Sequence, residues 1–370
     1  MNIASNRHNP LLEGVRVLDL TRLLPGPFCT LYLAQLGAEV IKIEEPEGGD
    51  YARHSPELFA QVNRGKKSIT LDLRNQDHRQ QFLALVKTAD LVIESFRPGV
   101  MKKLGCDYET LRAINPRLVY ASLTGYGHTG PYRHLAGHDN NYCAYAGVLE
   151  QAGAAGGEPV LSNFQAADLA GGALTCGMAV LAALIGAKAS GQGTFVDAAM
   201  LDGTLALQVM ALSTVRTLGS LQPRGADVFT GAFPHYGIYA CADGKHLAVG
   251  AFEFKFFLNL CTALGRPDLL QLPLAAGEAG QPLRQALTDI FKTRSRDEWA
   301  ALLEGHDACT TPVLSLEEAL ENEQVRAREM VERVNGKTAF AFPVRFDQPL
   351  AAAHPAPALG QHNQEILGAS

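Results

Sequence analysis

The sequence lacks the features that mark nucleic-acid-binding, metal and redox proteins. Its 370 residues carry 32 Lys and Arg against 38 Asp and Glu, a net charge of −6, so no basic field favours a nucleic-acid partner. Seven cysteines occur at wide spacings, and no CxxC pair suggests a zinc or redox site. We therefore expect reduced cysteines, no metal and a cytoplasmic location, where thiols stay reduced.

Cofactor-binding motifs are absent too. The loop after the first expected strand, Thr21 to Pro27, has no GxGxxG pattern, and the chain has neither a P-loop nor an HExxH motif. The chain therefore lacks the usual motifs for binding nicotinamide, flavin, a nucleoside triphosphate or a catalytic zinc ion. The sequence therefore predicts no tightly bound cofactor.

Membrane and targeting signals are missing as well. Residues 1–10 are polar and have no apolar leader core, and residues 367–370 match no retention or peroxisomal address. One segment, 169–186, is apolar and rich in Ala and Gly. Its high content of Ala and Gly predicts a buried helix rather than a membrane span.

The pattern of apolar residues predicts an α/β fold in the first half of the chain. Strands alternate with helices, which is typical of an open parallel sheet with right-handed crossovers. The expected strands are 15–20, 39–43, 68–73, 91–94 and 118–124, and the expected helices are 28–36 and 78–89. Ligands of such Rossmann-like sheets bind at the carboxyl ends of the strands.

The second half predicts a smaller α+β domain. Two antiparallel strands, 233–241 and 246–251, are joined by a turn at 242–245, and helices at 253–264, 281–293 and 296–304 follow. We expect a large domain from 1–200 and 332–370, a small domain from 226–318, and linker helices at 201–225 and 319–331. Within these, 201–219 predicts one helix, 316–332 a charged helix, and 343–370 a surface segment rich in Pro and Ala.

His138 is the first candidate for chemistry. It follows Gly137, which lets the backbone approach a ligand, and imidazole accepts protons near neutral pH. The residues alone also fit an ordinary loop histidine, so both interpretations stay open here.

Two acids are further candidates. Asp168 opens the apolar segment and precedes Gly171 and Gly172, which suggests that something packs closely against this helix start. Backbone N–H groups there could hold an enolate oxygen, but an acid at a helix start is commonly only a cap. Glu253, between Phe252 and Phe254, either partners a buried base or caps a helix.

Basic residues cluster at 64–67 and 97–103, on either side of expected strands. A polyphosphate ligand at the strand ends would use both clusters, whereas solvated turns would explain each of them separately.

Many segments in one order give the chain a resemblance to a known family. They are Leu12–Val17, Pro25–Pro27, Leu36–Val40, Arg64–Ser68, Arg97–Val100, Thr124–Gly127, Gly193–Met200 and Thr311–Leu314. The chain is similar to the family III coenzyme A transferases and, within them, to the α-methylacyl-CoA racemases. The resemblance runs from residue 12 to about 346.

The resemblance implies roles for the three candidates. Transferases and racemases share the aspartate that falls on Asp168, which attacks the thioester in transferases. Racemases pair it with a histidine, which falls on His138, and with a glutamate that bonds this histidine, which falls on Glu253. This implies a 1,1-proton transfer between 2-methylacyl-CoA epimers through an enolate. A CoA transferase and a non-catalytic acyl-CoA-binding protein are the alternatives.

The resemblance also implies where coenzyme A, as part of the thioester substrate, would bind. The implied contacts are Leu71, Asp72, Leu73, Arg74, Ser95, Phe96, Arg97, Lys103, Gly137, Asp139, Asn140, Asn141 and Tyr142. Two positions depart from the racemase pattern: Glu45 replaces an arginine, and Asn140 replaces an isoleucine. An acid repels phosphate, so we expect either that Lys42 or the Arg64–Lys67 cluster compensates for Glu45, or that the nucleotide binds more weakly or in a shifted position.

The resemblance finally implies an interlocked homodimer in which each chain threads the other. Glu253 of the partner subunit would then lie beside His138 and Asp168. The identity of the acyl group does not follow from the sequence.

Overall fold

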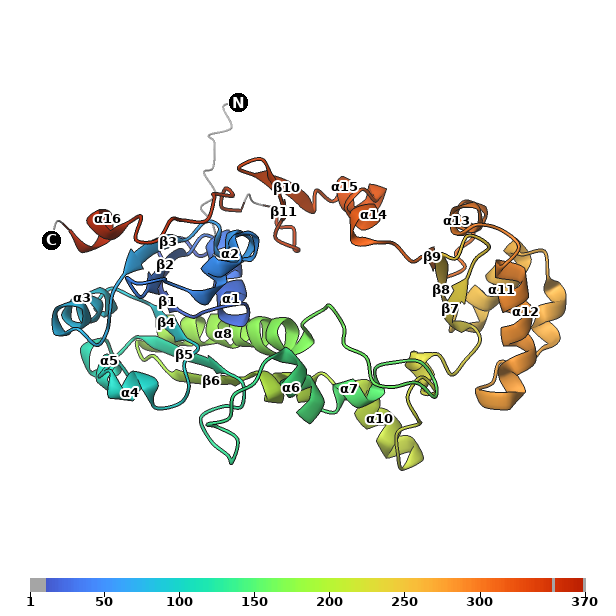
Figure 1. Cartoon of the computed structure of the whole chain (residues 1–370), viewed down its shortest axis with the longest axis horizontal. Helices are drawn as coiled ribbons and strands as arrows, with labels where there is room; N and C mark the ends of the chain where they lie inside the picture. Colours follow the sequence, from blue (N-terminus) through green and yellow to red (C-terminus); the bar gives the residue numbers. More distant parts are fainter. Residues whose placement is uncertain (1–10, 348–349, 369–370) are drawn as a thin grey trace. The chain divides into compact units, whose positions relative to one another are not determined.

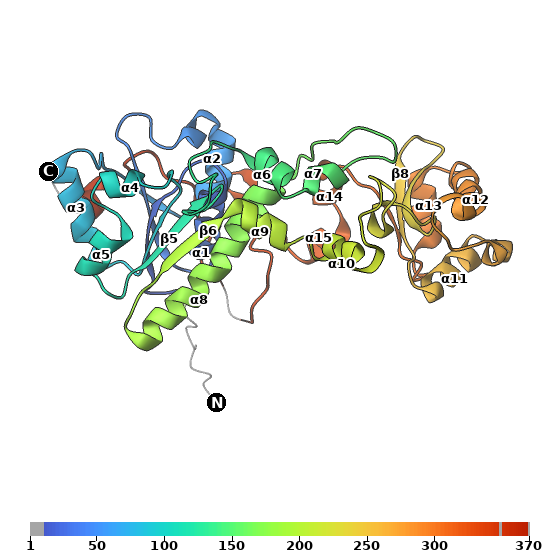
Figure 2. The same ribbon diagram turned by 90° about the horizontal axis from the view of Figure 1, so that it is seen from below.

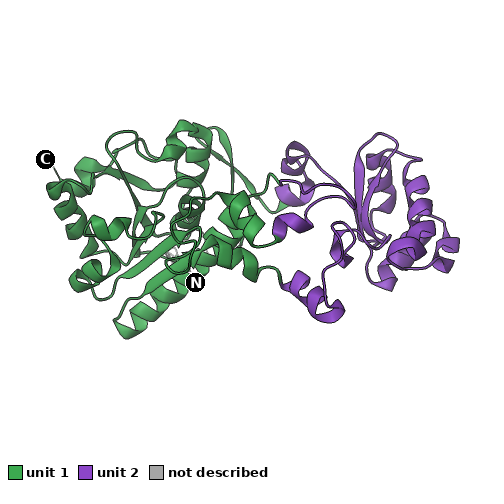
Figure 3. Cartoon of the chain, turned by 60° about the horizontal axis from the view of Figure 1, so that its bottom comes forward, with its two compact units in different colours: residues 1–147, 162–208, 327–370 green, residues 148–161, 209–326 purple. Residues whose placement is uncertain are grey.

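The computed structural model describes residues 11–347 and 350–368. They form two compact units, which are drawn in different colours in Figure 3. The first unit comprises residues up to 147, 162–208 and 327 onward, and the second comprises 148–161 and 209–326.

The first unit contains a six-stranded parallel sheet in the order β3-β2-β1-β4-β5-β6 (Figure 1). The strands are β1 (Arg16–Leu20), β2 (Glu39–Glu44), β3 (Lys67–Thr70), β4 (Leu91–Glu94), β5 (Val119–Thr124) and β6 (Phe195–Ala199). The predicted Rossmann-like parallel α/β sheet is therefore confirmed. The strand order reverses between β1 and β4, which is where such sheets bind ligands.

Helices connect the strands and cover the sheet. They are α1 (Pro25–Gln35), α2 (Pro56–Asn63), α3 (Gln76–Val86), α4 (Val100–Lys103), α5 (Tyr108–Ile114), α6 (Asp139–Tyr145), α8 (Thr175–Ser190), α9 (Met200–Ala206) and α16 (Asn363–Leu367). Two shorter helical segments are η1 (Tyr51–His54, a 3₁₀ helix) and η2 (Ala167–Leu174, a π-helix that runs directly into α8).

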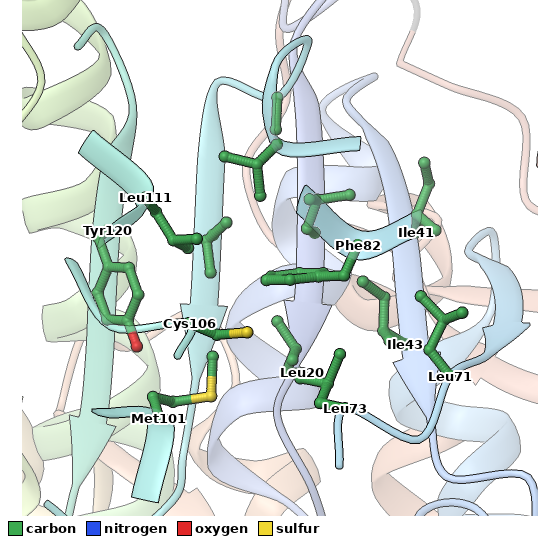
Figure 4. Packing of buried hydrophobic residues seen from close by; sticks show 14 of the residues in the cluster. Leu20, Ile41, Ile43, Leu71, Leu73, Phe82, Met101, Cys106, Leu111 and Tyr120 are labelled. Atoms are coloured by element: carbon green, nitrogen blue, oxygen red, sulfur yellow. The ribbon is translucent and has the colours of Figure 1, made fainter. Parts of the chain in front are cut away.

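One face of the sheet is sealed by a continuous apolar core (Figure 4). Phe82 of α3 lies in its middle and is fully buried, with Leu20, Ile41 and Ile43 of the strands around it. Met101 of α4 and Leu111 of α5 extend the cluster, together with Leu71 and Leu73 after β3. The opposite face carries α1 and α8, which touch through the buried thiols of Cys29 and Cys176 (Figures 1 and 2).

The helix formed by η2 and α8 differs from its prediction. The segment 169–186 is helical, but in the single chain it is not buried throughout: Leu174, Met178 and Ile185 are 46%, 68% and 71% exposed. These residues lie four and seven positions apart and so share one face of the helix. Among the described residues this is the one helix that is long and apolar enough to cross a membrane, a test that core helices of soluble proteins also pass.

The second unit packs helices against a three-stranded antiparallel sheet in the order β7-β8-β9. Its strands are β7 (Tyr236–Ala240), β8 (His246–Gly250) and β9 (Thr310–Pro312), and its main helices are α10 (Val209–Leu218), α11 (Phe254–Ala263), α12 (Gln281–Phe291) and α13 (Arg296–Leu303). Shorter helices are α7 (Val148–Gln151), α14 (Leu316–Leu320), α15 (Glu323–Ala327), η3 (Val228–Thr230), η4 (Pro267–Gln271) and η5 (Gly277–Gly280). Phe257, Leu287 and Phe291 are fully buried in its core.

The compact units divide the chain differently from the predicted domains in two places. Residues 148–161, expected in the large domain, belong to the second unit, because the Arg224 guanidinium donates to Glu150 O at 2.8 Å and pairs with the Glu150 carboxylate at 3.0 Å. Both expected linkers are divided between the units: residues 209–225 and 319–326 group with the second unit, and 201–208 and 327–331 with the first.

Two local predictions were wrong. The single helix expected over 201–219 is broken at residues 207–208 into α9 and α10. The helix expected over 316–332 ends earlier, and residues 331–334 form strand β10 of a hairpin with β11 (Lys337–Phe340). Asn335 and Gly336 both have positive φ, at 51° and 76°, which is the two-residue turn that Asn-Gly favours.

Candidate active site

The candidate active site is a cavity of about 660 Å³ at the carboxyl end of the parallel sheet, formed by the first unit alone. Loops from three neighbouring strands line it: Arg22 and Leu23 after β1, Ser95 to Pro98 after β4, and Gly125 and Tyr126 after β5. These strands flank the point where the strand order reverses, so the sheet itself places the cavity. His138 and Asp168 both line it.

His138 occupies the N-cap of α6 and is exposed toward the cavity. Its backbone N–H donates to Asn141 Oδ1 at 3.0 Å, and its carbonyl accepts from the Asn141 N–H at 2.9 Å. This reciprocal pairing fixes the backbone that carries the imidazole.

Gly137 leaves room for the tyrosine side chains that pack against the backbone before His138. A Cβ at this position would lie 2.7 Å from the Tyr142 ring and 3.0 Å from the Tyr126 hydroxyl. The Tyr142 hydroxyl donates to Gly137 O at 2.7 Å. The glycine is therefore required by the ring that packs over it, as well as being adjacent to the candidate base.

Asp168 lies in the first turn of η2, and π-helical insertions next to an α-helix recur at functional sites. Burial, and in second place the negative charge of Asp139, raise the pKa of its carboxyl to about 7. Asp139 Oδ1 also accepts a hydrogen bond from the Asp168 backbone N–H at 2.8 Å. Asp139 therefore both holds this turn in place and keeps the neighbouring carboxyl partly protonated near neutral pH.

The predicted close packing against this helix start is present, and the neighbour is α9. A Cβ on Gly171 would lie 2.3 Å from Thr204 Oγ1, and one on Gly203 would lie 1.9 Å from Gly171 O. Backbone N–H groups at this helix start were expected to be able to hold an enolate oxygen, but those of Asp168 and Leu169 are already bonded within the protein. The Asp168 N–H is bonded to Asp139, and the Leu169 N–H donates to Gln165 O at 3.0 Å.

A second, smaller cavity of about 220 Å³ adjoins the first, because Arg22 and Phe96 line both. Most of the implied coenzyme A contacts fall on these two walls. The smaller cavity is lined by Leu71, Asp72, Leu73 and Arg74, and the larger by Ser95, Arg97, Gly137, Asn141 and Tyr142. Asp139 and Asn140 are their neighbours on α6, while Lys103 on α4 is exposed and lines neither cavity.

The predicted roles of Lys42 and Arg64 in binding the substrate require correction. Lys42 has no exposed surface, its ammonium donates to Thr21 O at 2.9 Å, and it is paired with Asp50 at 2.8 Å. Arg64 is 6% exposed, faces Glu332 at 3.6 Å, and lines other cavities of the unit. Neither Lys42 nor Arg64 lines either of the two cavities described above.

The remainder of the Arg64–Lys67 cluster is also engaged internally. The Lys66 ammonium is buried against Asp19 at 3.1 Å, and Lys67 pairs with Glu39 at 2.8 Å. A basic run before a strand therefore reflects the protein's own buried and surface ion pairs here, and it does not build a phosphate site.

Arg22 is a residue that the sequence interpretation missed. Its guanidinium lies over the rings of Phe96 at 4.8 Å and Tyr51 at 5.3 Å, and pairs with Glu45 Oε1 at 3.4 Å. Glu45 is thus balanced by Arg22, not by Lys42. The position of Arg22 directly after the first strand was the available signal, since ligand sites of parallel sheets lie there.

Glu94 at the end of β4 is the second missed residue. Burial raises the pKa of its carboxyl to about 7. Its Oε2 accepts a hydrogen bond from the Phe96 N–H at 2.7 Å, so it holds the backbone of the residue that lines both cavities. An apolar strand ending in a glutamate gave no sign that this acid is buried.

Glu253 belongs to the second unit, where it directly precedes α11. Its pairing with His138 stays a prediction. Within the described ranges, no three His, Cys, Asp or Glu side chains are grouped so that they could hold a metal ion.

Comparisons with known proteins agree on one family. A family model described as CoA-transferase family III matches residues 12–363. The chain is 35% identical to the alpha-methylacyl-CoA racemase of Homo sapiens, over 96% of this chain and 92% of that protein. It is 33% identical to the succinyl-CoA:glutarate CoA-transferase of Mus musculus, over 96% of this chain and 85% of that protein. A crystal structure of a CAIB/BAIF family protein from Brucella suis superposes with a TM-score of 0.86 at 32% identity, covering 97% of this chain and 99% of that one.

Proposed function

The chain belongs to CoA-transferase family III, and from that premise we propose that it is an α-methylacyl-CoA racemase or epimerase. It interconverts 2-methylacyl-CoA thioesters by moving the proton at carbon 2 through an enolate. The observation that carries the proposal is that a histidine and an aspartate of raised pKa, His138 and Asp168, line one cavity.

The proposed reaction needs one proton shared between two groups. In one direction the neutral imidazole of His138 removes the α-proton, while the protonated carboxyl of Asp168 delivers its proton to the opposite face of the carbon. In the other direction the Asp168 carboxylate is the base and the His138 imidazolium is the acid. A pKa of about 7 for Asp168 allows both of its forms to be populated near neutral pH.

The proposal includes an interlocked homodimer. In it, Glu253 of the partner subunit bonds to the imidazole of His138, fixes its tautomer and stabilises its charged form. The thioester extends from the larger cavity, which holds the acyl group and the reacting carbon, past Arg22 and Phe96 into the smaller cavity, which takes the nucleotide end.

The alternative function is transfer of CoA between an acyl-CoA and a free carboxylate. The specific observation in its favour is that several relatives about as similar as the racemases are named CoA-transferases. In that reaction the Asp168 carboxylate attacks the thioester carbonyl, forming an acyl anhydride and releasing the CoA thiolate. The thiolate then attacks the aspartyl carbonyl of the anhydride, which gives an aspartyl thioester and releases the donor carboxylate. The acceptor carboxylate repeats the two steps in reverse and leaves as the new acyl-CoA, restoring Asp168. His138 has no required role in those steps.

The deciding experiment measures α-hydrogen exchange by proton NMR in D₂O across a panel of 2-methylacyl-CoA epimers. The parent protein should exchange and interconvert both epimers. His138→Ala should abolish exchange of one epimer and Asp168→Ala that of the other, because each variant keeps one base.

The contradicting outcome is read by assaying CoA transfer and adduct formation with the same thioesters. A parent protein that exchanges no α-hydrogen, but transfers CoA and yields a covalent adduct on Asp168 that hydroxylamine traps, is a transferase. Transfer that persists in His138→Ala would give the same answer.

A further inference from the structure

The smaller cavity lies at the carboxyl end of β2, and Glu45 follows that strand directly. Its floor is apolar, with Leu20, Ile43 and Leu71 among the lining residues. The Glu45 side chain is 44% exposed and faces the guanidinium of Arg22 at 3.4 Å. Because Arg22 also lines the larger cavity, a ligand that spans both must pass this ion pair.

The cations of the smaller cavity are each matched by a carboxylate. Arg74 Nε donates to Asp72 Oδ1 at 2.8 Å, and Arg22 is paired with Glu45. A third carboxylate, Glu44, is held by Arg53 at 2.7 Å. The described lining therefore has three carboxylates against two guanidiniums, and a phosphate entering it meets no cation without a bound acid.

The larger cavity has the opposite balance. Arg97 and Arg133 join Arg22 on its wall, against the single carboxyl of Asp168, whose pKa is raised. Phosphates at the junction are thus attracted by Arg97, because Arg22 is already paired with Glu45, whereas a group farther into the smaller cavity meets Glu45. The charges therefore favour a diphosphate at the junction of the cavities and disfavour a phosphate on the ribose in the smaller cavity.

An acid at the end of the second strand has a known consequence in sheets of this strand order. By fold-level analogy with dinucleotide-binding domains, such an acid hydrogen-bonds a ribose hydroxyl, whereas an arginine nearby accommodates a ribose phosphate. Glu45 occupies that position, and a carboxylate accepts hydroxyl protons but repels a phosphomonoester.

We propose that Glu45 sets the nucleotide specificity of this site: it accepts an adenosine diphosphate group with ribose hydroxyls and cancels any gain in binding from the 3′-phosphate of coenzyme A. The inference rests on the proposed function, since it takes the thioester carrier as the ligand. Arg22 is the positioning partner, because Glu45 holds its guanidinium over Phe96 at the junction of the cavities. Thioesters of 3′-dephospho-coenzyme A are thus substrates as good as those of coenzyme A.

The test compares two carriers, coenzyme A and 3′-dephospho-coenzyme A, by isothermal titration calorimetry at one fixed ionic strength. The parent should bind them within about threefold of each other. Glu45→Arg should strengthen binding of coenzyme A relative to the dephospho form by about tenfold, because it replaces repulsion by a guanidinium that pairs with phosphate. Glu45→Gln should give a shift of the same sign and smaller size.

The matched control is Glu47→Gln. It removes the same charge two residues along the chain from Glu45, and the Glu47 side chain is exposed and does not line the cavity. It should leave the ratio of affinities within about twofold, since exposed charges are screened by salt. The proposal is overturned if the parent prefers coenzyme A by tenfold or if Glu45→Arg leaves the ratio unchanged. If neither carrier binds, the proposed function is overturned as well. If the parent exchanges α-hydrogen but Glu45→Arg leaves the ratio of the two affinities unchanged, only the specificity is overturned.

Discussion

At Asp168, burial and a neighbouring carboxylate act in the same direction. Both raise the pKa of its carboxyl, which reaches about 7. The same Asp139 that raises the pKa also accepts the Asp168 backbone N–H at 2.8 Å, so position and protonation are set together. A carboxyl that is half protonated at neutral pH can serve as acid or base, which a two-base reaction requires of it.

The pH dependence of the rate follows from this shared proton. Below the working range both His138 and Asp168 are protonated and no base remains, and above it both are deprotonated and no acid remains. We expect kcat/KM for racemisation to be bell-shaped, with the same limbs for both epimers and one limb near pH 7. Initial rates of epimer interconversion at constant ionic strength would measure it.

A transferase reaction predicts a different profile. Its nucleophile is the Asp168 carboxylate, so its rate rises through about pH 7 and then stays level. A level alkaline limb in epimer interconversion would contradict the two-base scheme.

The residues of the site differ in how far sequence could identify them. His138 and Asp168 could be assigned a role only through resemblance, because a loop histidine and a helix cap have the same local pattern. Lys42 was misassigned because its partner Asp50 is brought to it by the fold, and sequence separation hides that ion pair. Arg22 was missed although its place after β1 was recognisable, since a lone arginine in a loop carries no further signal.

At the scale of elements, the packing of η2 on α9 positions Asp168. The two segments meet through glycines, and a Cβ on Gly203 would lie 1.9 Å from the carbonyl oxygen of Gly171. Backbone atoms cannot move aside as a flexible side chain can. The π-helical segment that carries the candidate catalytic carboxyl is therefore located by contact between two backbones.

Gly203→Ala should destabilise the protein by about 2–3 kcal/mol, because the added methyl overpacks this contact. The exchange activity should also fall at temperatures where the variant is still folded, because Asp168 moves with η2. Gly177→Ala is the matched control: it lies in α8, and its Cβ would meet Cys29 Sγ at an ordinary 3.6 Å. Urea unfolding at one protein concentration measures both variants. Equal midpoints for Gly203→Ala and the parent would show that the contact is not constrained.

Most elements of the parallel sheet follow from local sequence, but two kinds of boundary do not. The apolar run over 201–219 reads as one helix, yet it breaks at 207–208, where the first compact unit ends. At the break the Gln208 side-chain amide donates to Ala146 O, a tertiary contact that the local sequence does not reveal. The hairpin at Asn335 and Gly336 was predictable, since that dipeptide favours a turn with two positive φ angles, and the charged residues before it concealed the strand.

At the scale of the whole molecule, the single chain leaves apolar side chains of several helices exposed. Leu174, Met178 and Ile185 form a stripe along η2 and α8, and Val209, Met210 and Leu218 of α10 are 65%, 53% and 58% exposed. Exposed apolar side chains that gather on one helix, as they do separately on each of these two units, mark contact surfaces in soluble proteins. A second copy of the chain is the occupant that the proposed function requires, because it also supplies the partner of His138.

The oligomeric state tests this last step. The parent should sediment at twice its 39.7 kDa mass, and the double variant Met178→Glu, Ile185→Glu should dissociate at concentrations where the parent stays paired, because each buried charge without a partner costs several kcal/mol. Ala113→Glu places the same charge on an exposed site of α5 and should leave the dimer intact. Dissociation should also remove racemisation, since Glu253 of the partner subunit is lost from the site. A monomeric parent that racemises both epimers would refute the shared site, and a double variant that stays dimeric would move the interface away from α8.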